Sequence, residues 1–520
     1  MKMSADKILN PVSCVVAAGV LLGGSTACAE AVDVRRSPVR YADFGAKGDG
    51  VADDFDAIIA AHAHANAHAL PVRADDGATY FIGGGRRTAE IKTDTDFGTA
   101  AFRIDDTQVS LDDKGASVFS VRSSQPRVRL EGLTFLKRDQ RDLGIRLASA
   151  SVVVVVDANV RQYIRRGLNE NKGSAKTDVL LVAADGTIDP RTPPLWDFDA
   201  ITEATAHPVD AAVLSVRGGR FTTIANRAPS EYTYFARGIQ IERSNVRVEG
   251  LEHRVVGEGE HGAPYSGFIR IGRCADVEVR NVLFSGRKTY STIGSAGKPV
   301  SMGSYDLAMD RAINVSVIGC TQANDIDDSR LWGVMTSNFC KNLLYEDCTL
   351  SRFDAHQGLF NGIVRRSRLR MINLIGGGTF RLEDSVVTGN RLISLRNDYG
   401  STWQGDVIVR NTTLDPAGDQ PQHTLSLIGG SNDGSHDFGY PCSMPHRVEL
   451  ENVRIQDLPA AESYRGPVLF GDFKIDPSGG KSPYAPPREV HINDVTTTSG
   501  LALRISDQPA VFADTKIVER

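Results

Sequence analysis

The chain has 520 residues, of which 41% are hydrophobic, 7% are aromatic and 24% are charged. These are ordinary values for a folded protein, so they exclude extensive disorder. The formal net charge of −5 argues against a nucleic-acid-binding protein, which needs a basic face, and we expect no nucleic acid partner.

The first residues have the features of a targeting segment. Lys2 and Lys7 precede an apolar run over residues 12–22, and small residues follow as far as Ala29. This pattern predicts a signal peptide over residues 1–29 and a secreted or periplasmic protein. A lipid anchor on Cys28 is the less favoured alternative, because Ser25 replaces the usual Leu. The apolar run is too short to span a bilayer, and we expect no membrane span elsewhere.

Residues 30–144 are predicted to form an N-terminal cap and the first strands of the fold. Residues 43–54 are rich in Gly and Asp, which favour tight turns and helix starts. An Ala-rich helix is expected from about Phe55 to Ala69, followed by a strand from Gly77 to Ile82.

This N-terminal segment resembles the signature of the pectate-lyase-3, or rhamnogalacturonase/epimerase-like, superfamily. The resemblance covers the turn-rich residues 43–54, the Ala-rich helix and the strand around Tyr80. Members of the superfamily include polygalacturonase-like hydrolases, some lyases and phage tailspikes. The resemblance implies a right-handed parallel β-helix with one end covered by the helix.

Residues 145–210 are predicted to form a small β-rich subdomain inserted in the solenoid. Residues 151–157 form a continuous apolar run, and Asp185-Gly186 predicts a hairpin turn. The basic residues Arg161, Arg165 and Arg166 form either a solvated charge cluster, which we favour, or a contact for an acidic substrate.

Residues 211–520 are predicted to form the main body, with closing strands after Arg488. Similar rows occupy residues 272–286, 310–324, 338–352 and 358–370, each made of two alternating apolar runs between polar corners. A side-chain period of two indicates strands, and repeats of this length indicate a solenoid. Because no row can bury its apolar face alone, the rows must stack. We therefore predict an all-β fold, a right-handed parallel β-helix.

Five cysteines remain after the predicted leader, an odd number. Cys320 and Cys348 occupy equivalent places in successive rows, so we expect them to stack inside the coil. Buried free thiols are favoured over a disulfide, and no cysteine pair has zinc-site spacing, so no metal site is predicted.

Charged residues gather at the corners of the rows. The segments are residues 324–330, 352–356 and 396–399. Since stacked strands lie about 4.8 Å apart, neighbouring corners should share one groove. The predicted catalytic residues in this groove are Asp327, Asp328, Asp354, His356 and Asp398.

Glycoside hydrolysis is the favoured reaction. It needs one carboxylic acid and one carboxylate, about 5–5.5 Å apart for retention and about 6.5–9.5 Å apart for inversion. Asp354 with Asp327 or Asp328 is the predicted pair. The cluster resembles that of polygalacturonase-like hydrolases, although their Gly-His-Gly and Arg-Ile-Lys signatures are missing.

The first alternative is a polysaccharide lyase that acts by β-elimination on a uronate. Arg330 or Arg396 would neutralise the carboxylate, and His356 or Tyr399 would remove the proton. No cofactor is expected for a hydrolase, whereas calcium is a candidate cofactor for a lyase. The predicted substrate-binding residues are Arg330, Trp332, Arg396, Tyr399 and Trp403, the two tryptophans as stacking surfaces.

The second alternative is a non-catalytic, carbohydrate-binding or adhesin-like β-helix. Polar corners are normal in such a fold, because Asp and Asn stabilise turns through their own backbone. In all three interpretations the partner is a polysaccharide. The sequence leaves the oligomeric state open.

Overall fold

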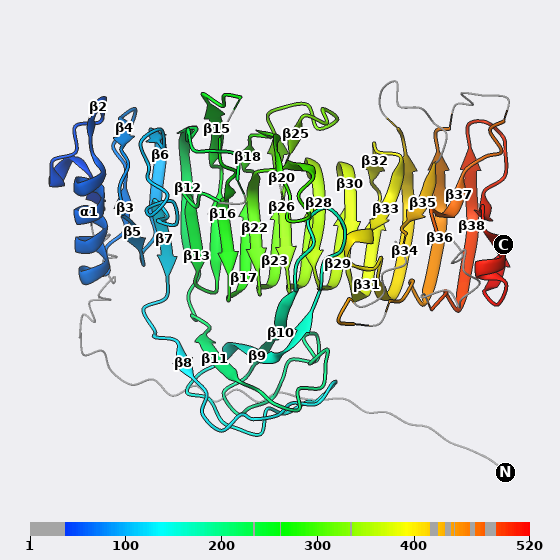
Figure 1. Ribbon diagram of the computed structural model, residues 1–520. Coiled ribbons are helices and arrows are strands. Elements are labelled where there is room, and N and C mark those ends of the chain that lie inside the picture. The colour runs from blue at the N-terminus through cyan, green and yellow to red at the C-terminus, as the bar shows by residue number, and fades with distance from the viewer. Residues whose placement is uncertain are drawn as a thin grey trace, which may run out of the picture. The chain divides into compact units, whose positions relative to one another are not determined.

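The computed structural model describes residues 37–231, 234–260, 262–332, 335–416, 425–431, 438–440, 442–457, 463–473 and 485–520. The predicted signal peptide, residues 1–29, and the alternative lipid site at Cys28 lie outside these ranges. The described chain is a right-handed parallel β-helix in which successive rungs stack in chain order (Figure 1), as the row pattern predicted.

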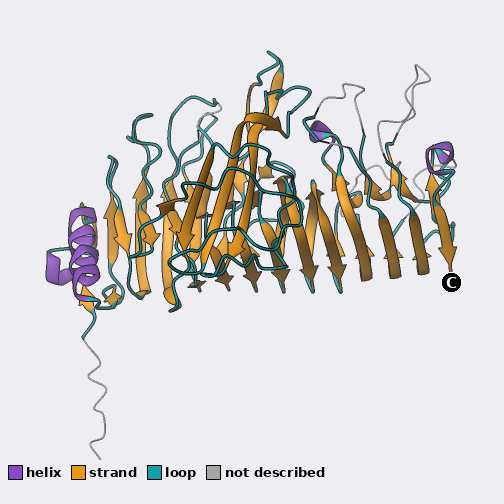
Figure 2. Ribbon diagram, turned by 90° about the horizontal axis from the view of Figure 1, so that it is seen from below, coloured by secondary structure: helices purple, strands orange, loops and turns teal. Residues whose placement is uncertain are grey.

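The N-terminal end carries a helix and the first short strands. Helix α1, Phe55–His68, begins where the carboxylate of Asp53 accepts a hydrogen bond from the Phe55 amide at 3.0 Å. Phe55 and Ile58 are buried against the first rungs, so the helix covers the open end of the apolar core (Figure 2), as predicted. The other elements here are β1 (Val39–Arg40), η1 (Ala42–Phe44), β2 (Asp49–Asp53), β3 (Val72–Arg73), β4 (Thr79–Ile82), β5 (Ala89–Ile91), β6 (Thr95–Asp105) and β7 (Phe119–Arg122).

Each rung passes through three strand positions, which form what we call the first, second and third sheets. The first sheet contains β5, β7, β13 (Ile239–Glu242), β16 (Ser266–Gly272), β22 (Tyr305–Asp310), β26 (Met335–Asn338), β33 (Arg391–Leu395), β35 (Ser426–Gly429), β37 (Val468–Gly471) and β39 (Arg504–Ser506). The second contains β14 (Val246–Glu249), β17 (Ala275–Arg280), β23 (Ile313–Ile318), β27 (Lys341–Glu346), β29 (Leu359–Arg365), β31 (Gly376–Glu383) and β40 (Lys516–Glu519).

The third sheet contains β15 (Glu252–Val256), β18 (Leu283–Phe284), β24 (Thr321–Gln322) and β32 (Val386–Val387). Longer strands run through two positions. They are β6, β12 (Leu214–Ile224), β28 (Thr349–Gln357), β30 (Arg368–Leu374), β34 (Trp403–Leu414), β36 (Arg447–Ile455) and β38 (Glu489–Thr497). Loops between rungs carry two small antiparallel pairs, β19 (Arg287–Lys288) with β25 (Leu331–Trp332) and β20 (Tyr290–Ile293) with β21 (Pro299–Met302).

The corner between the second and third sheets has one backbone geometry in eight successive rungs. One residue in each corner has a φ between 47° and 63°, the left-handed region. Asn and Asp tolerate this region better than other residues with a side chain, which explains their frequency there. Their amides also link rungs, since Asn452 donates to Asn411 and Asn411 donates to Asp384, each at 2.9 Å.

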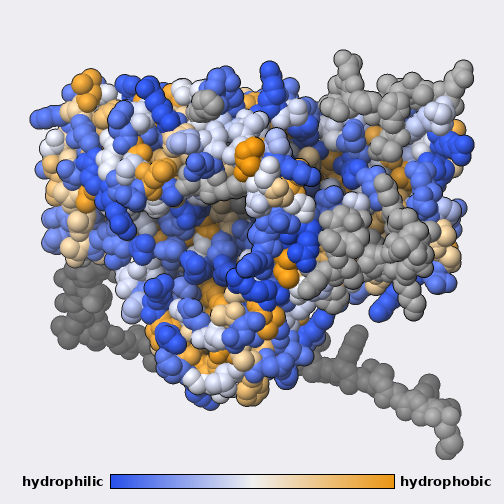
Figure 3. Space-filling view, viewed as in Figure 1, coloured by the Kyte–Doolittle hydropathy of each residue, from blue (hydrophilic) through white to orange (hydrophobic). Residues whose placement is uncertain are grey.

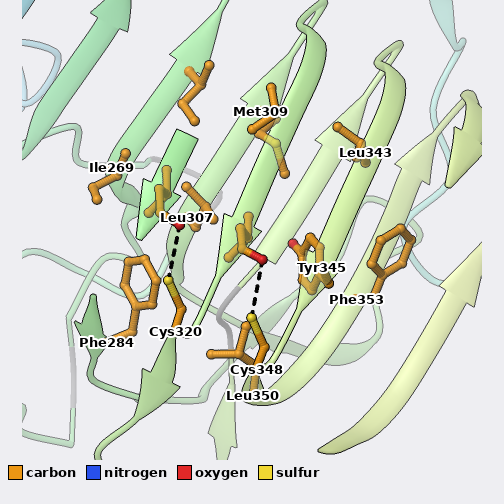
Figure 4. Packing of buried hydrophobic residues seen from close by; sticks show 14 of the residues in the cluster. Ile269, Phe284, Leu307, Met309, Cys320, Leu343, Tyr345, Cys348, Leu350 and Phe353 are labelled. Atoms are coloured by element: carbon orange, nitrogen blue, oxygen red, sulfur yellow. Dashed lines mark hydrogen bonds between the residues drawn. The ribbon is translucent and has the colours of Figure 1, made fainter. Parts of the chain in front are cut away.

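The interior is a continuous apolar column in which like positions stack. Cys320 and Cys348 lie in it on successive rungs (Figure 4), and each thiol donates to a carbonyl of the preceding rung, Val279 at 3.5 Å and Val317 at 3.4 Å. Five cysteines in the described residues are buried and form no disulfide, which confirms the prediction of free thiols.

The inserted subdomain is a four-stranded antiparallel sheet with strand order β10-β9-β11-β8. Its strands are β8 (Val128–Arg129), β9 (Ser151–Gln162), β10 (Ser174–Val182) and β11 (Glu203–Pro208). Because β8 precedes residue 145, this sheet begins earlier in the chain than the sequence suggested.

The apolar run of β9 is continuous because both of its faces are buried. Val153 and Val155 pack in the subdomain's own core against residues such as Phe198. Val152 and Val154 on the other face pack against Ala275 and Ile313 at the starts of β17 and β23. A strand covered on one face only would alternate apolar and polar residues.

A buried ion pair also joins the subdomain to the solenoid. Lys341 Nζ on β27 lies 2.8 Å from Asp178 Oδ1 on β10, and both side chains are almost completely buried. Lys341 also donates to the carbonyl of Pro193 at 2.6 Å. Burial lowers the pKa of Lys341, although the charge of Asp178 opposes this shift.

The C-terminal rungs end in the short helix η3, Pro509–Phe512. Phe512 stacks on Phe470 with ring centroids 4.6 Å apart and closes the apolar column at this end. No helix in the described part of the chain is long and apolar enough to cross a membrane.

Candidate active site

Asp354 and His356 lie within a strand, and the expectation that they occupy a corner is wrong. β28 runs from Thr349 to Gln357 without interruption and passes from the third to the first sheet. Phe353 and Ala355 point into the core, so the alternation places Asp354 and His356 on the outer face of the first sheet. Their pairing with the corner residues 324–330 was inferred from sequence spacing, which cannot show where a rung continues without a turn.

Asp354 is held between two arginines and is buried. Its Oδ1 lies 2.9 Å from Arg396 Nη1, and its Oδ2 lies 3.3 Å from Arg352 Nη1. Burial by itself would raise the pKa of Asp354, but Arg396 and Arg352 hold it below its ordinary value. Asp354 is therefore a carboxylate at neutral pH, and it is unsuited to be the acid of a hydrolase.

Asp398 extends this ion network into the corner after β33. It accepts from Arg396 at 3.2 Å and from Arg165 Nη2 at 2.6 Å, so Arg165 of the inserted subdomain contacts the site. Burial opposes ionisation of Asp398, yet Arg396 and Arg165 lower its pKa. Arg165 of the basic patch thus forms an ion pair with Asp398 instead of a solvated charge, and its contact with an acidic substrate stays a prediction.

His356 is half-buried beside this network, and its ring lies 5.7 Å from that of Tyr399. Burial, together with the nearby Arg396, lowers the pKa of His356 to about 3. The imidazole is therefore neutral at physiological pH. Tyr399 is buried, and Arg165 and Arg396 lie over its ring at 5.5 Å and 5.4 Å.

His356 opens into a groove of about 420 Å³ on the outer face of the first sheet. The groove crosses β13, β16, β22, β26 and β28, and Tyr234 and Tyr305 stack at its side with ring centroids 6.2 Å apart. Its other lining residues include Gln240, Glu242, Ser266, Arg270, Gly272, Arg273, Ala308, Asp310 and Asn338. An elongated hollow with aromatic and charged sides is suited to a chain of sugar rings.

Sequence reasoning missed a row of residues at the ends of the first-sheet strands. Glu242, Gly272, Asp310 and Asn338 follow one another in register from β13 to β26. Two rungs separate the Glu242 and Asp310 backbones, which is roughly 9–10 Å at the usual strand spacing. Aligning the rows by their strands instead of their corners would have revealed this pair of carboxylates with a glycine between them.

The other predicted residues do not join the Asp354 site. Asp328 forms an ion pair with Arg330 at 2.7 Å on an exposed loop, so neither residue joins the Asp354 site. Asp327 accepts a hydrogen bond from Thr388 and lines a separate cavity of about 270 Å³ with Arg370 and Arg391. The paired carboxylates expected from Asp354 with Asp327 or Asp328 therefore do not form.

Of the two tryptophans predicted to stack on sugars, the structure describes the side chain of Trp403. Trp403 is fully buried in the core, where its Nε1 donates to the carbonyl of Asp406 at 3.2 Å. Its assignment as a sugar-stacking surface is wrong, because the first residue of β34 points inward. The Trp332 side chain lies outside the described residues.

Within the described ranges, no three His, Cys, Asp or Glu side chains are arranged to hold a metal ion. In the Asp cluster of the 325–328 loop, the carboxylate of Asp328 pairs with Arg330, that of Asp327 accepts from Thr388, and that of Asp325 accepts from the Asp327 amide. These residues do not fit a calcium site.

A second buried polar cluster lies under the loops of the third sheet. Asp306 Oδ1 lies 3.1 Å from Arg287 Nε and 3.5 Å from His253 Nδ1, and all three side chains are buried. Asp106 with Arg237, at 2.9 Å, and the half-buried Glu258 surround them. Burial raises the pKa of Asp306 to about 7, although Arg287 opposes the shift.

This cluster predicts a pH-dependent stability. A carboxyl group whose folded pKa exceeds its unfolded value contributes stability at low pH, and that contribution disappears as pH rises through the folded value. We expect the contribution of Asp306 to the thermal midpoint to fall between about pH 4 and pH 7, the unfolded and folded pKa values, and Asp306→Asn to flatten this slope. Melts of both proteins at 0.5-unit steps, beside the exposed control Asp514→Asn, test it. An unchanged slope in Asp306→Asn refutes the assignment.

No family model matches the chain, and no curated protein matches it. Its resemblance to the pectate-lyase-3 superfamily therefore stays a prediction. Among solved structures, the tailspike protein gp49 from Pseudomonas phage LKA1 aligns with a TM-score of 0.54 and 16% identity, over 92% of this chain and 84% of that protein. The Pseudomonas phage phi297 tailspike gp61 aligns with a TM-score of 0.52 and 14% identity, over 88% and 80%. The chain is thus a parallel β-helix similar in fold to these tailspikes.

Proposed function

We propose that the chain binds a polysaccharide in the first-sheet groove and cleaves it by β-elimination. The observation that carries this proposal is the position of His356 at the edge of an elongated groove, beside a network of arginines. Elimination from a uronate requires a base at C5 and cations that neutralise the carboxylate. The groove offers both kinds of group, whereas Asp354 and Asp398 are held as carboxylates.

In the proposed reaction His356 removes the C5 proton of the uronate. The C4–O4 bond then breaks, a C4–C5 double bond forms, and the departing oxygen takes a proton from water. Arg270 and Arg273, both in the groove lining, neutralise the substrate carboxylate. Asp354, Arg396 and Asp398 position the edge of the groove that holds His356 and Tyr399.

Glycoside hydrolysis is the second candidate, with Glu242 and Asp310 in place of the pair predicted from the sequence. Their separation over two rungs is close to the range for inversion, about 6.5–9.5 Å between carboxyl groups. Gly272 lies between them and leaves space for a sugar ring. Both carboxylates already pair with arginines, Glu242 with Arg122 at 3.4 Å and Asp310 with Arg311 at 2.6 Å, so we rank this reaction second.

A panel of acidic and neutral polysaccharides tests the proposal. Reducing ends and absorbance near 235 nm are followed together, because only elimination produces the unsaturated product. We expect both signals to rise with a uronate-containing polymer. Reducing ends alone would indicate hydrolysis. Neither signal, together with retention on a polysaccharide column, would indicate a binding protein. We also propose a secreted or periplasmic location, which cell fractionation tests.

A further inference from the structure

Another hollow, of about 500 Å³, lies between the inserted subdomain and the corner that follows the first sheet. Strands β8, β9 and β11 form its subdomain side, and Arg273 and Arg311 form its solenoid side. Hydrophilic residues predominate where the subdomain meets the solenoid (Figure 3). Of the residues that line this hollow, the proposed reaction uses Arg273 alone.

The charge around this hollow is strongly one-sided. Arg127, Arg129, Arg273 and Arg311 line it, and Glu203 is the one carboxylate among the described residues of its lining. The chain as a whole has a net charge of −5, so the concentration of guanidinium groups here is local. Guanidinium groups bind carboxylate, sulfate and phosphate through paired hydrogen bonds.

These arginines are not all neutralised within the protein. Arg127 is exposed and has no ion-pair partner in the part of the chain that the structure describes. Among the described residues, Arg129 forms one ion pair, with the exposed Glu131 at 3.1 Å, and such a pair is easily exchanged for a ligand. Arg273 lies 3.7 Å from Glu242, a distance too long for a direct hydrogen bond.

The floor of the hollow adds a surface for a sugar ring. Val156 continues the apolar face of β9 beyond Val154, which packs on the solenoid, and both residues line the hollow. Half-buried His207 lies beside them. Burial, with help from Arg273 and Arg127, lowers the pKa of His207 to about 4, so it is a neutral hydrogen-bonding group here.

Arg273 belongs both to this hollow and to the first-sheet groove. A glycan in the groove can therefore extend across the corner without leaving the protein surface. We propose that the hollow between the subdomain and the solenoid binds an anionic substituent of the glycan, namely a carboxylate, a sulfate ester or a phosphate ester. This substituent lies on a part of the glycan away from the bond that is cleaved. This inference rests on the proposed function for the glycan, while the anion site itself rests on the arginines.

The test uses the full chain and three polymers, namely polygalacturonate, dextran sulfate and neutral dextran. Affinity electrophoresis measures Kd for the wild type and for the double variant Arg127→Gln/Arg129→Gln. The matched control, Arg254→Gln/Arg454→Gln, removes the same charge from exposed positions on the third sheet. We expect Kd for the anionic polymers to rise roughly tenfold in the subdomain variant, as for loss of one or two charged hydrogen bonds, and to stay unchanged in the control.

Equal weakening in both double variants would mean non-specific attraction and would overturn the inference. Binding of neutral dextran as tightly as of the anionic polymers would overturn it too. The polymer that loses more affinity identifies the group, carboxylate or sulfate ester. Cleavage assays on the same proteins separate the two proposals. Anion binding without any cleavage would contradict the proposed reaction but would leave the anion site standing. A thermal melt confirms that the variants are folded.

Discussion

We expect His356→Gln to lower kcat/KM for polysaccharide cleavage by roughly 10²–10⁴, the usual effect of losing a general base. His356 is the neutral imidazole at the groove, and Gln keeps a polar side chain of similar length without a base. The measurement is the initial rate of absorbance increase near 235 nm on a uronate polymer. Because the pKa of His356 is about 3, the rate should not fall between pH 8 and pH 5 through protonation of this residue.

The control is His64→Gln, an exposed histidine on α1 that lies outside the groove. A thermal melt of each variant separates loss of chemistry from loss of folding. Full activity in His356→Gln with an unchanged melt contradicts the assignment. If activity is instead lost in Glu242→Gln and Asp310→Asn while His356→Gln remains active, the second candidate, hydrolysis, becomes the favoured reaction.

The second large effect concerns stability, at the ion pair between the subdomain and the solenoid. We expect Lys341→Met to reduce the free energy of unfolding by roughly 3–5 kcal/mol, because it leaves Asp178 charged and buried without its partner. Urea unfolding followed by circular dichroism measures this change. The double variant Lys341→Met/Asp178→Leu should recover much of the loss, since replacing a whole buried pair with apolar residues is often neutral.

A surface pair supplies the comparison. Arg330 and Asp328 lie at a similar distance, 2.7 Å, but Arg330 is exposed, so Arg330→Met should leave stability unchanged. Equal effects of Lys341→Met and Arg330→Met would show that burial of the Lys341 pair is not what stabilises the subdomain.

The structure also changes the expected effect of Asp354→Asn. From the sequence, this substitution should lower turnover by roughly 10²–10⁴ and leave folding intact, because Asn keeps the shape of Asp and removes only its charge. Asp354 is instead buried between Arg396 and Arg352. Removing its charge takes one carboxylate away from both arginines, of which Arg396 keeps Asp398, so we expect a lower thermal midpoint together with any loss of activity. An unchanged midpoint would mean that solvent reaches these arginines.

The sequence by itself determined the repeating architecture. A period of two in side-chain polarity and corners at regular intervals are local features, and each row carries them independently of the others. The capping helix over residues 55–68 and the buried free thiols of Cys320 and Cys348 follow from the same local patterns. The continuous apolar run of residues 151–157 likewise indicated strands outside the solenoid repeat.

Only the tertiary structure decided which residues meet. Whether a row turns or continues straight depends on packing against the rung below, and β28 continues where a corner was expected. That difference moved Asp354 and His356 onto the first sheet and separated them from Asp327 and Asp328. Arg165 reaches Asp398 across 233 positions of sequence, through a subdomain whose docking depends on Lys341 and the outer face of β9. Contacts between residues so far apart in sequence depend on how the rungs stack, and they produce no periodic pattern in the amino-acid sequence.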